Sequence, residues 1–174
     1  MRKIVKYLLS VIIAIIIVML IQAFIIIGAV VKTDNMAPVL NKDDRILVSK
    51  VQAAFNQIHN SDVIMYRHNG HTYFGRVIGT PGESVEYKDG QLFRDDQLVK
   101  ERYDIKNPIQ NLALRDLKHS EGDILAPKHY LVLNDNRAQQ QDSRQFGTIH
   151  QKDIIGKVVL RYYPFQQFKI SFNE

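Results

Sequence analysis

The sequence predicts a mainly β protein, in which a single N-terminal transmembrane helix precedes an antiparallel β domain with a small inserted β subdomain. Three observations support this fold class. A long apolar run lies near the N-terminus, short runs of β-branched and aromatic residues follow it, and an Asp-Gly pair separates two of those runs. With 174 residues, the chain has room for one membrane segment and one ordinary globular domain.

The apolar run extends from Tyr7 to Val31, and Gln22 is its only strongly polar residue. A helix of this length would measure roughly 37 Å, which exceeds a bilayer hydrocarbon core of about 30 Å. The apolar region of a cleaved signal peptide is usually shorter, about 7 to 15 residues. An apolar run this long is also unusual for a buried helix in a small soluble protein. Residues 7–31 are therefore predicted to form a transmembrane helix.

Positive charge gathers before the apolar run, where Arg2, Lys3 and Lys6 contribute +3 of the net charge of +5. Positive residues on a short N-terminal segment favour its retention in the cytoplasm. We therefore expect a single-pass protein of the cell membrane, with residues 1–6 as a cytoplasmic tail and the main domain outside. The remaining charge of +2 (5 − 3) is small, and no basic and aromatic clusters indicate a nucleic-acid partner.

Short runs of β-branched and aromatic residues after the helix predict strands by their composition and length. These segments are Arg45–Val51, Asp62–Tyr66, Tyr73–Ile78, Tyr130–Leu133 and Ile154–Tyr162. The Asp89-Gly90 pair between Ser84–Tyr87 and Gln91–Phe93 predicts a two-residue hairpin, because both turn residues tolerate positive φ. Residues 103–129 are expected to be loops with one helical turn near Leu112–Leu117. The β core would comprise residues 32–82 and 130–174, and residues 83–129 would form the inserted subdomain.

Three sequence blocks follow the apolar run. The first holds Thr33-Asp34-Asn35-Met36-Ala37-Pro38 and Asp44–Val48, the second runs from Tyr73 to Glu83, and the third holds Asn134-Asp135-Asn136-Arg137 and Asp142-Ser143-Arg144. In order, spacing and position they resemble the boxes of type I signal peptidases, including the degenerate, pilus-associated members of Gram-positive cocci. The third block is the most specific, because its two charged triplets at this spacing are improbable by chance. The resemblance spans nearly the whole chain and implies a signal-peptidase-like fold.

The first block departs from the family at the nucleophile. The family uses a serine directly before the methionine of this block, and a serine hydroxyl becomes a good nucleophile only when a neighbouring base takes its proton. Aligned on Met36 and Pro38, the serine position holds Asn35. An amide has no proton to lose at useful pH, so the resemblance implies that the nucleophile is missing.

The general base is replaced as well. The family's base is a lysine, which can accept a proton near neutral pH only in an apolar site that lowers its pKa. Aligned on Arg76 and Gly79, the lysine position holds Gly75, and Gln140 stands where a serine hydroxyl orients that lysine. With no catalytic residue of the dyad intact, the chain is predicted to be a non-cleaving homologue.

An active signal peptidase with an unorthodox site is the alternative. Lys32, Lys42 and Lys50 lie near the first block and could act as bases only within about 3 Å of the abstracted proton. Asp34 beside Asn35 would, by a shift of one residue, place a carboxylate at the nucleophile position.

Two carboxylates can also share a proton, so Asp34 could pair with Asp135 or Asp142 as in aspartic proteases. Salt bridges of Asp135 with Arg137 and of Asp142 with Arg144 are the favoured interpretation of these two aspartates.

Other block residues are expected to support the framework: Arg76, Asp135, Asn136, Arg137, Asp142, Ser143 and Arg144. Three glycines of the family's boxes are replaced by Asp43, Ser61 and Asn134. Asparagine tolerates left-handed backbone angles better than most residues, so Asn134 is expected to keep its turn. The residue types do not decide whether the turns at Asp43 and Ser61 keep the backbone geometry of the glycines that they replace.

Binding can outlast catalysis, because the family holds its substrate as an extended strand through main-chain hydrogen bonds and pocket shape. Thr33 stands where many members carry an oxyanion-hole hydroxyl, and is either a retained donor or an ordinary threonine; Met36 and Pro38 either line the groove or pack. The resemblance implies a chaperone-like accessory factor of pilus assembly that binds exported precursor proteins at the outer membrane face, with pilin subunits as the favoured client. A membrane-tethered structural protein with decayed motifs is a further alternative.

No metal and no cofactor are predicted. The chain has no cysteine, which excludes disulfides and thiolate sites. His68 and His71 are close in sequence, but two histidines without a third ligand at suitable spacing are more often surface residues.

Overall fold

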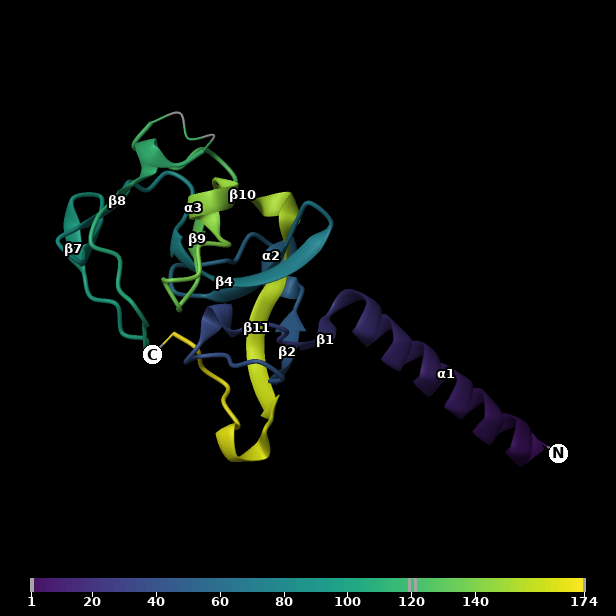
Figure 1. Ribbon diagram of the computed structural model, residues 1–174. Coiled ribbons are helices and arrows are strands. Elements are labelled where there is room, and N and C mark those ends of the chain that lie inside the picture. The colour runs from purple at the N-terminus through teal and green to yellow at the C-terminus, as the bar shows by residue number, and fades with distance from the viewer. Residues whose placement is uncertain (1, 119, 121, 174) are drawn as a thin grey trace.

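In the computed structural model, helix α1 (Arg2–Phe24) projects from a domain of β-strands (Figure 1). The described residues are 2–118, 120 and 122–173; Met1, His119, Glu121 and Glu174, and the side chains of residues 2, 3, 22 and 23, lie outside the description. The predicted orientation therefore rests partly on charges outside the described residues. The window Ile4–Ile21 has a mean hydropathy of 3.0 and is unburied, so α1 is long and apolar enough to cross a membrane.

The predicted boundaries of the membrane helix, residues 7–31, differ from the observed ones. The helix begins at Arg2, inside the segment predicted to be a tail, and ends at Phe24. Strand β1 (Ile26–Val30) follows after one residue and pairs with β2 (Arg45–Ser49), with Gly28 opposite Leu47. A run of isoleucine and valine suits a membrane helix and a strand equally, and here strand pairing decides. The shorter helix still measures about 34 Å at 1.5 Å per residue.

The main sheet has seven strands in the order β1-β2-β11-β3-β4-β9-β10, and its neighbouring strands pair antiparallel. Its remaining strands are β3 (Val63–His68), β4 (His71–Gly79), β9 (His129–Leu133), β10 (Ile149–His150) and β11 (Ile154–Tyr163). Each of the five predicted strands overlaps one strand of this sheet, with ends displaced by at most two residues. Strands β1 and β10 were not predicted.

A second antiparallel sheet, of order β7-β6-β5-β8, lies between β4 and β9 in sequence and at one end of the domain (Figure 1). Its strands are β5 (Val85–Lys88), β6 (Gln91–Arg94), β7 (Gln97–Val99) and β8 (Leu112–Ala113). The predicted hairpin turn is present, with φ of 49° at Asp89 and 79° at Gly90. Together with α1 and the main sheet, this sheet confirms the predicted fold class.

Short helices complete the domain. The α-helices are α2 (Val51–Ala54) and α3 (Ser143–Phe146), and the 3-10 turns are η1 (Asp34–Met36), η2 (Leu114–Asp116), η3 (Gln151–Asp153) and η4 (Phe165–Gln167). Turn η2 is the single turn expected near Leu112–Leu117. One apolar cluster, which includes Val31, Met36, Leu40, Ile46 and Val48, fixes η1 against the sheet.

Two of the three replaced box glycines keep a glycine-like backbone. Asp43 has a φ of 70° and Ser61 a φ of 71°, so both turns survive in the left-handed region. Asn134 does not, because it is absent from the residues with positive φ. Its side-chain amide instead donates to the carbonyl oxygens of Gln139 (2.9 Å) and Gln141 (3.4 Å). The expected reason for tolerating asparagine was therefore wrong.

Replacing Ser61 by glycine is expected to raise the free energy of unfolding by about 0.5–1 kcal/mol. A left-handed backbone costs a residue with a Cβ atom roughly 1–2 kcal/mol, and the greater chain entropy of glycine offsets part of this gain. Urea unfolding would measure the difference. Ser61→Ala keeps the Cβ and should give no gain; an equal gain from alanine would contradict the explanation.

Candidate functional site

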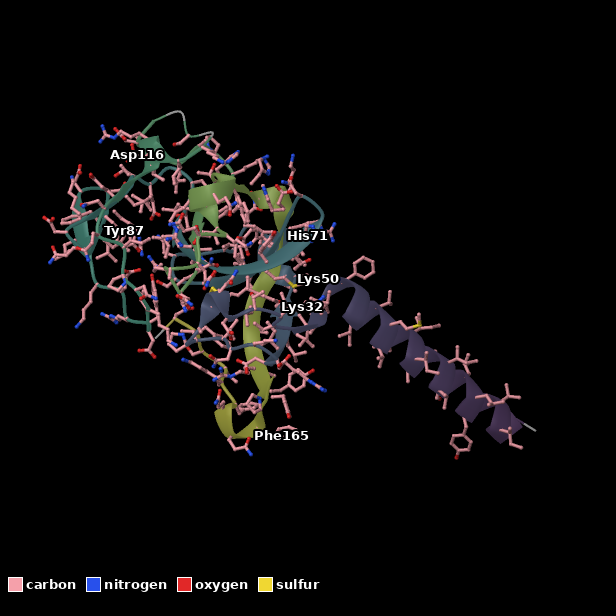
Figure 2. All side chains as sticks on the ribbon, in the orientation of Figure 1. Lys32, Lys50, His71, Tyr87, Asp116 and Phe165 are labelled. Carbon is pink, nitrogen blue, oxygen red and sulfur yellow. The ribbon has the colours of Figure 1, made fainter. Side chains whose placement is uncertain are left out.

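A groove of about 560 Å³ lies between β1 and the first half of β4. Three strands separate β1 from β4 in the sheet, so the sheet must curve for both to line one groove. Residues after β1, in η1, on β3 and in the turn between β3 and β4, together with Gln141, complete the lining. The lining residues are Gly28, Ala29, Val30, Val31, Lys32, Thr33, Asn35, Met36, Met65, Gly70, His71, Thr72, Tyr73, Phe74 and Gln141. Figure 2 shows Lys32 near the start of the domain and His71 at the hairpin between β3 and β4.

Strand β1 is an edge strand of the main sheet, paired on one side only. At its two ends, Ile25 accepts and Val31 donates a main-chain hydrogen bond on the β2 side, at 2.8 and 2.9 Å. Residues of a strand alternate in the direction of these bonds. Gly28 and Val30 stand at the alternate positions to Ile25 and Val31, so their main-chain N–H and C=O groups point to the free edge. Nothing lies within 4 Å of where a Cβ atom of Gly28 would stand, so the sheet face beside this free edge is open as well.

Turn η1 brings Asn35 to the groove wall, and the third sequence block holds it there. The N–H of Asn136 donates to the carbonyl oxygen of Asn35 at 2.9 Å, and the Asn136 side chain donates to the Asp34 carbonyl oxygen at 3.4 Å. Turn η1 also contacts β4, which carries Gly75. The fold thus places the turn that carries Asn35 against the strand that carries Gly75, the two residues predicted to stand at the family's dyad positions.

The three predicted groove residues lie in different surroundings. Thr33 lines the groove, is exposed, and its hydroxyl makes no hydrogen bond with any described residue, so it is available as a donor. Met36 lines the groove and is also a core residue, exposed by only 1%. Pro38 lies outside the groove lining, and its carbonyl oxygen accepts from the Asn41 side chain at 3.4 Å.

Gly75 is buried, and the space beside it is already filled. A Cβ atom at this position would lie 2.5 Å from Val132 Cγ1 and 3.3 Å from Tyr66 Cε1. The first distance is well below van der Waals contact, so any larger residue would have to displace the Val132 side chain. The site therefore lacks not only the lysine but also the room for one.

Tyr66 is the polar side chain nearest to the Cβ position of residue 75, and its hydroxyl cannot take the role of the lysine. Its hydroxyl is buried and has no hydrogen-bond partner among the described residues. Burial raises the pKa of Tyr66 well above its usual range, and the negative charge of Asp142 raises it further. The hydroxyl therefore keeps its proton and cannot act as a general base.

Gln140, predicted at the lysine-orienting position, is exposed and outside the groove lining, which holds its neighbour Gln141 instead. The three lysines considered as alternative bases also fail to complete a site. Lys32 lines the groove but is exposed rather than enclosed in an apolar site, and Lys42 is exposed outside the lining. Lys50 lines a separate cavity beside the end of α1.

The aspartates are committed to other partners, so no acidic pair forms. Asp34 accepts from the Lys42 main-chain N–H at 3.1 Å. Asp142 is bound by Arg144 at 2.6 Å, which agrees with the favoured salt bridge. Asp135 is bound by Arg76, at 2.6 and 2.7 Å, and not by Arg137 as expected. The sequence neighbour was the wrong choice because strand pairing brings Arg76 of β4 beside the end of β9.

Comparison with known proteins accounts for this arrangement. The family model described as "Signal peptidase, peptidase S26" matches residues 4–163. The chain belongs to the signal peptidase family. It is 48% identical over 173 residues to "Inactive signal peptidase IA" of Staphylococcus aureus strain Mu50, with 99% of both chains covered. It is 32% identical over 183 residues to "Signal peptidase IB" of S. aureus strain COL, with 99% of this chain and 96% of the relative covered.

A crystal structure of a signal peptidase I from Enterococcus faecalis V583 is similar in fold. The TM-score is 0.51 and the sequences are 30% identical, over 57% of this chain and 95% of the other. The predicted family membership is confirmed. Since close relatives are named inactive, the chain is a catalytically degenerate, non-cleaving signal peptidase homologue.

The retained box residues of this signal peptidase homologue form a buried scaffold rather than a reactive centre. Arg137 donates to Tyr87 Oη at 2.8 Å and to Glu101 at 2.9 Å, which joins the second sheet to the third block. Ser143 accepts from the Val132 main-chain N–H at 3.0 Å. Asp142 also accepts from the main-chain N–H of Asn134 at 2.9 Å. These bonds fix the third block against β9 and against the second sheet.

The two histidines considered as metal ligands make different contacts. The ring of His68 stacks on Phe146, with centroids 4.2 Å apart, while His71 lines the groove. Within the described ranges, no three His, Cys, Asp or Glu side chains are grouped to hold a metal ion.

Sequence reasoning missed several groove residues of this signal peptidase homologue. Gly28 lay inside the run assigned to the membrane helix, and Gln141 was passed over in favour of Gln140. A glycine within an isoleucine-rich segment was the one available signal, because glycine in a strand often marks close approach of another backbone.

Proposed function

We propose that the groove binds an extended segment of an exported precursor protein and releases it uncleaved. The free edge of β1 carries this proposal, because its unpaired main-chain groups and the open space at Gly28 suit an added strand. Thr33 offers a hydroxyl donor in the same groove. With Asn35 at the nucleophile position, a bound peptide meets no attacking group.

The location of the groove supports a client held at the membrane. Groove residues begin at Gly28, four residues after α1 ends at Phe24. We propose that α1 spans the cell membrane and that the domain lies on its outer face, where precursors emerge. Pilin subunits are the narrower client that we propose, and this choice rests on the family resemblance alone.

Photo-crosslinking in membranes would test the proposal. A photoreactive residue at Thr72, exposed on the β4 wall, should capture a co-expressed precursor with an Ala-x-Ala signal sequence, without releasing mature product. The same residue at Gln97 is the matched control, because Gln97 is exposed on another edge strand, β7. A pilin precursor and an unrelated precursor would be compared, with active signal peptidase IB as the cleavage standard.

Gly28→Trp should reduce the yield at Thr72 about tenfold by filling the open space, whereas Gly28→Ala should change it little. Equal capture at Thr72 and Gln97, or no capture, would contradict peptide binding and favour a structural tether. Release of mature product would contradict the non-cleaving assignment.

A further inference from the structure

A second cavity, of about 570 Å³, lies where α1 meets the β domain. It is separate from the groove and shares no lining residue with it. Its walls come from the end of α1, from α2, and from the segments that lead into β9 and β11. Figure 2 shows Lys50 of this cavity beside the domain end of α1.

The cavity is basic. Lys50, Lys128 and Lys152 line it together with His150, and none of the described aspartates and glutamates belongs to its lining. The three lysines come from separate segments of the chain, so the fold gathers them. Positive charge gathered in one cavity, with no anion among its described lining residues, favours an anionic ligand.

The backbone at Lys128 adds an independent observation. Lys128 has a φ of 63°, in the left-handed region that disfavours residues with a Cβ atom. The main-chain N–H of Gln151 donates to the Lys128 carbonyl oxygen at 2.8 Å and ties this turn to the η3 segment. Strained residues that the surrounding structure fixes occur preferentially at ligand sites.

The cavity also has an apolar side, and it lies at a defined depth. Phe24, the last residue of α1, lines it and is 71% exposed, and Ile155 lines it from β11. Phe24 follows the apolar window Ile4–Ile21 by three residues, or about 4.5 Å of helix. If α1 spans the bilayer, the cavity therefore lies at the level of the lipid headgroups.

We infer that this cavity binds the headgroup of an anionic phospholipid, such as phosphatidylglycerol, from the leaflet next to the β domain. Lys128 and Lys152 would contact the phosphate, and Phe24 and Ile155 would contact the glycerol and upper acyl chains. Basic pockets beside membrane helices are suited to such headgroups. The inference is independent of peptide binding in the groove.

Native mass spectrometry of the full-length protein, released from nanodiscs of equimolar phosphatidylglycerol and phosphatidylcholine, would test it. Wild-type protein should retain phosphatidylglycerol in preference to phosphatidylcholine. Lys128→Gln/Lys152→Gln should lower the retained fraction about tenfold, whereas Lys100→Gln/Lys118→Gln, an equal charge change at exposed lysines elsewhere, should leave it unchanged.

Thermal unfolding would confirm that both double variants fold. Equal retention of the two lipids, or equal losses in the two variants, would overturn the inference. Retention of inorganic phosphate without any preference for the anionic lipid would overturn it as well, because the site would then be a free-anion site.

Discussion

Replacing Asp135 by alanine is expected to lower the free energy of unfolding of the β domain by about 3–5 kcal/mol. The side chains of Asp135 and Arg76 are both fully buried, and two hydrogen bonds of 2.6 and 2.7 Å join them. Arg76 also donates to the carbonyl oxygens of Ser61 and Phe172 and lies over the Tyr103 ring, 3.8 Å from its centroid. Alanine would leave a buried guanidinium without its counter-charge.

Urea unfolding of the Asp135→Ala variant would measure this loss. Asp123→Ala is the matched control, because Asp123 pairs with Arg115 at 3.2 Å and both side chains are more than 60% exposed. Such an exposed pair contributes at most about 1 kcal/mol. Similar losses in the two variants would show that burial does not determine the contribution of the Arg76 pair.

Restoring the dyad alone is expected to fail. Asn35→Ser/Gly75→Lys/Gln140→Ser should cleave no precursor and should lose about 1–3 kcal/mol of stability through overpacking. The reason is the 2.5 Å distance from a Cβ at position 75 to Val132 Cγ1. Adding Val132→Ala removes that atom and gives the lysine side chain space.

The quadruple variant should therefore recover stability and cleave a precursor at an Ala-x-Ala site. A positioned general base typically contributes 10²–10⁴-fold, so its rate should exceed that of the same variant with Gly75 retained by about 100-fold. Cleavage of a fluorogenic precursor peptide, with a preparation free of host peptidase, would measure both rates. A triple variant as stable and as active as the quadruple one would disprove the role of Val132. Equal activity with Gln140 kept would show that this residue is not part of the disarming.

The strands were predictable where composition and turns agreed. Ile154–Tyr162 was expected and Ile154–Tyr163 is found, and the turn at Asp89 and Gly90 has the positive φ values that its residue types allow. The start of the domain was not predictable. Ile26–Val30 is as apolar as the helix before it, and only its pairing with β2, distant in sequence, makes it a strand.

The candidate site was predictable in its substitutions and not in its geometry. Alignment of the blocks located Asn35 and Gly75, but a single sequence could not show that Val132 fills the space next to Gly75. The partner of Asp135 was misassigned for the same reason, since Arg76 is 59 residues away along the chain. Contacts between strands depend on register, which local patterns do not fix.

Only Ile25 separates the last residue of α1 from the first residue of β1. A five-residue strand rises about 17 Å, so the whole β1 side of the groove lies within roughly 20 Å of the helix end. Because a single residue connects α1 to β1, a tilt of α1 would also tilt β1 and the groove. If α1 spans a membrane as proposed, the β1 side of the groove would reach only those segments of a bound chain that lie within about this distance of the lipid surface.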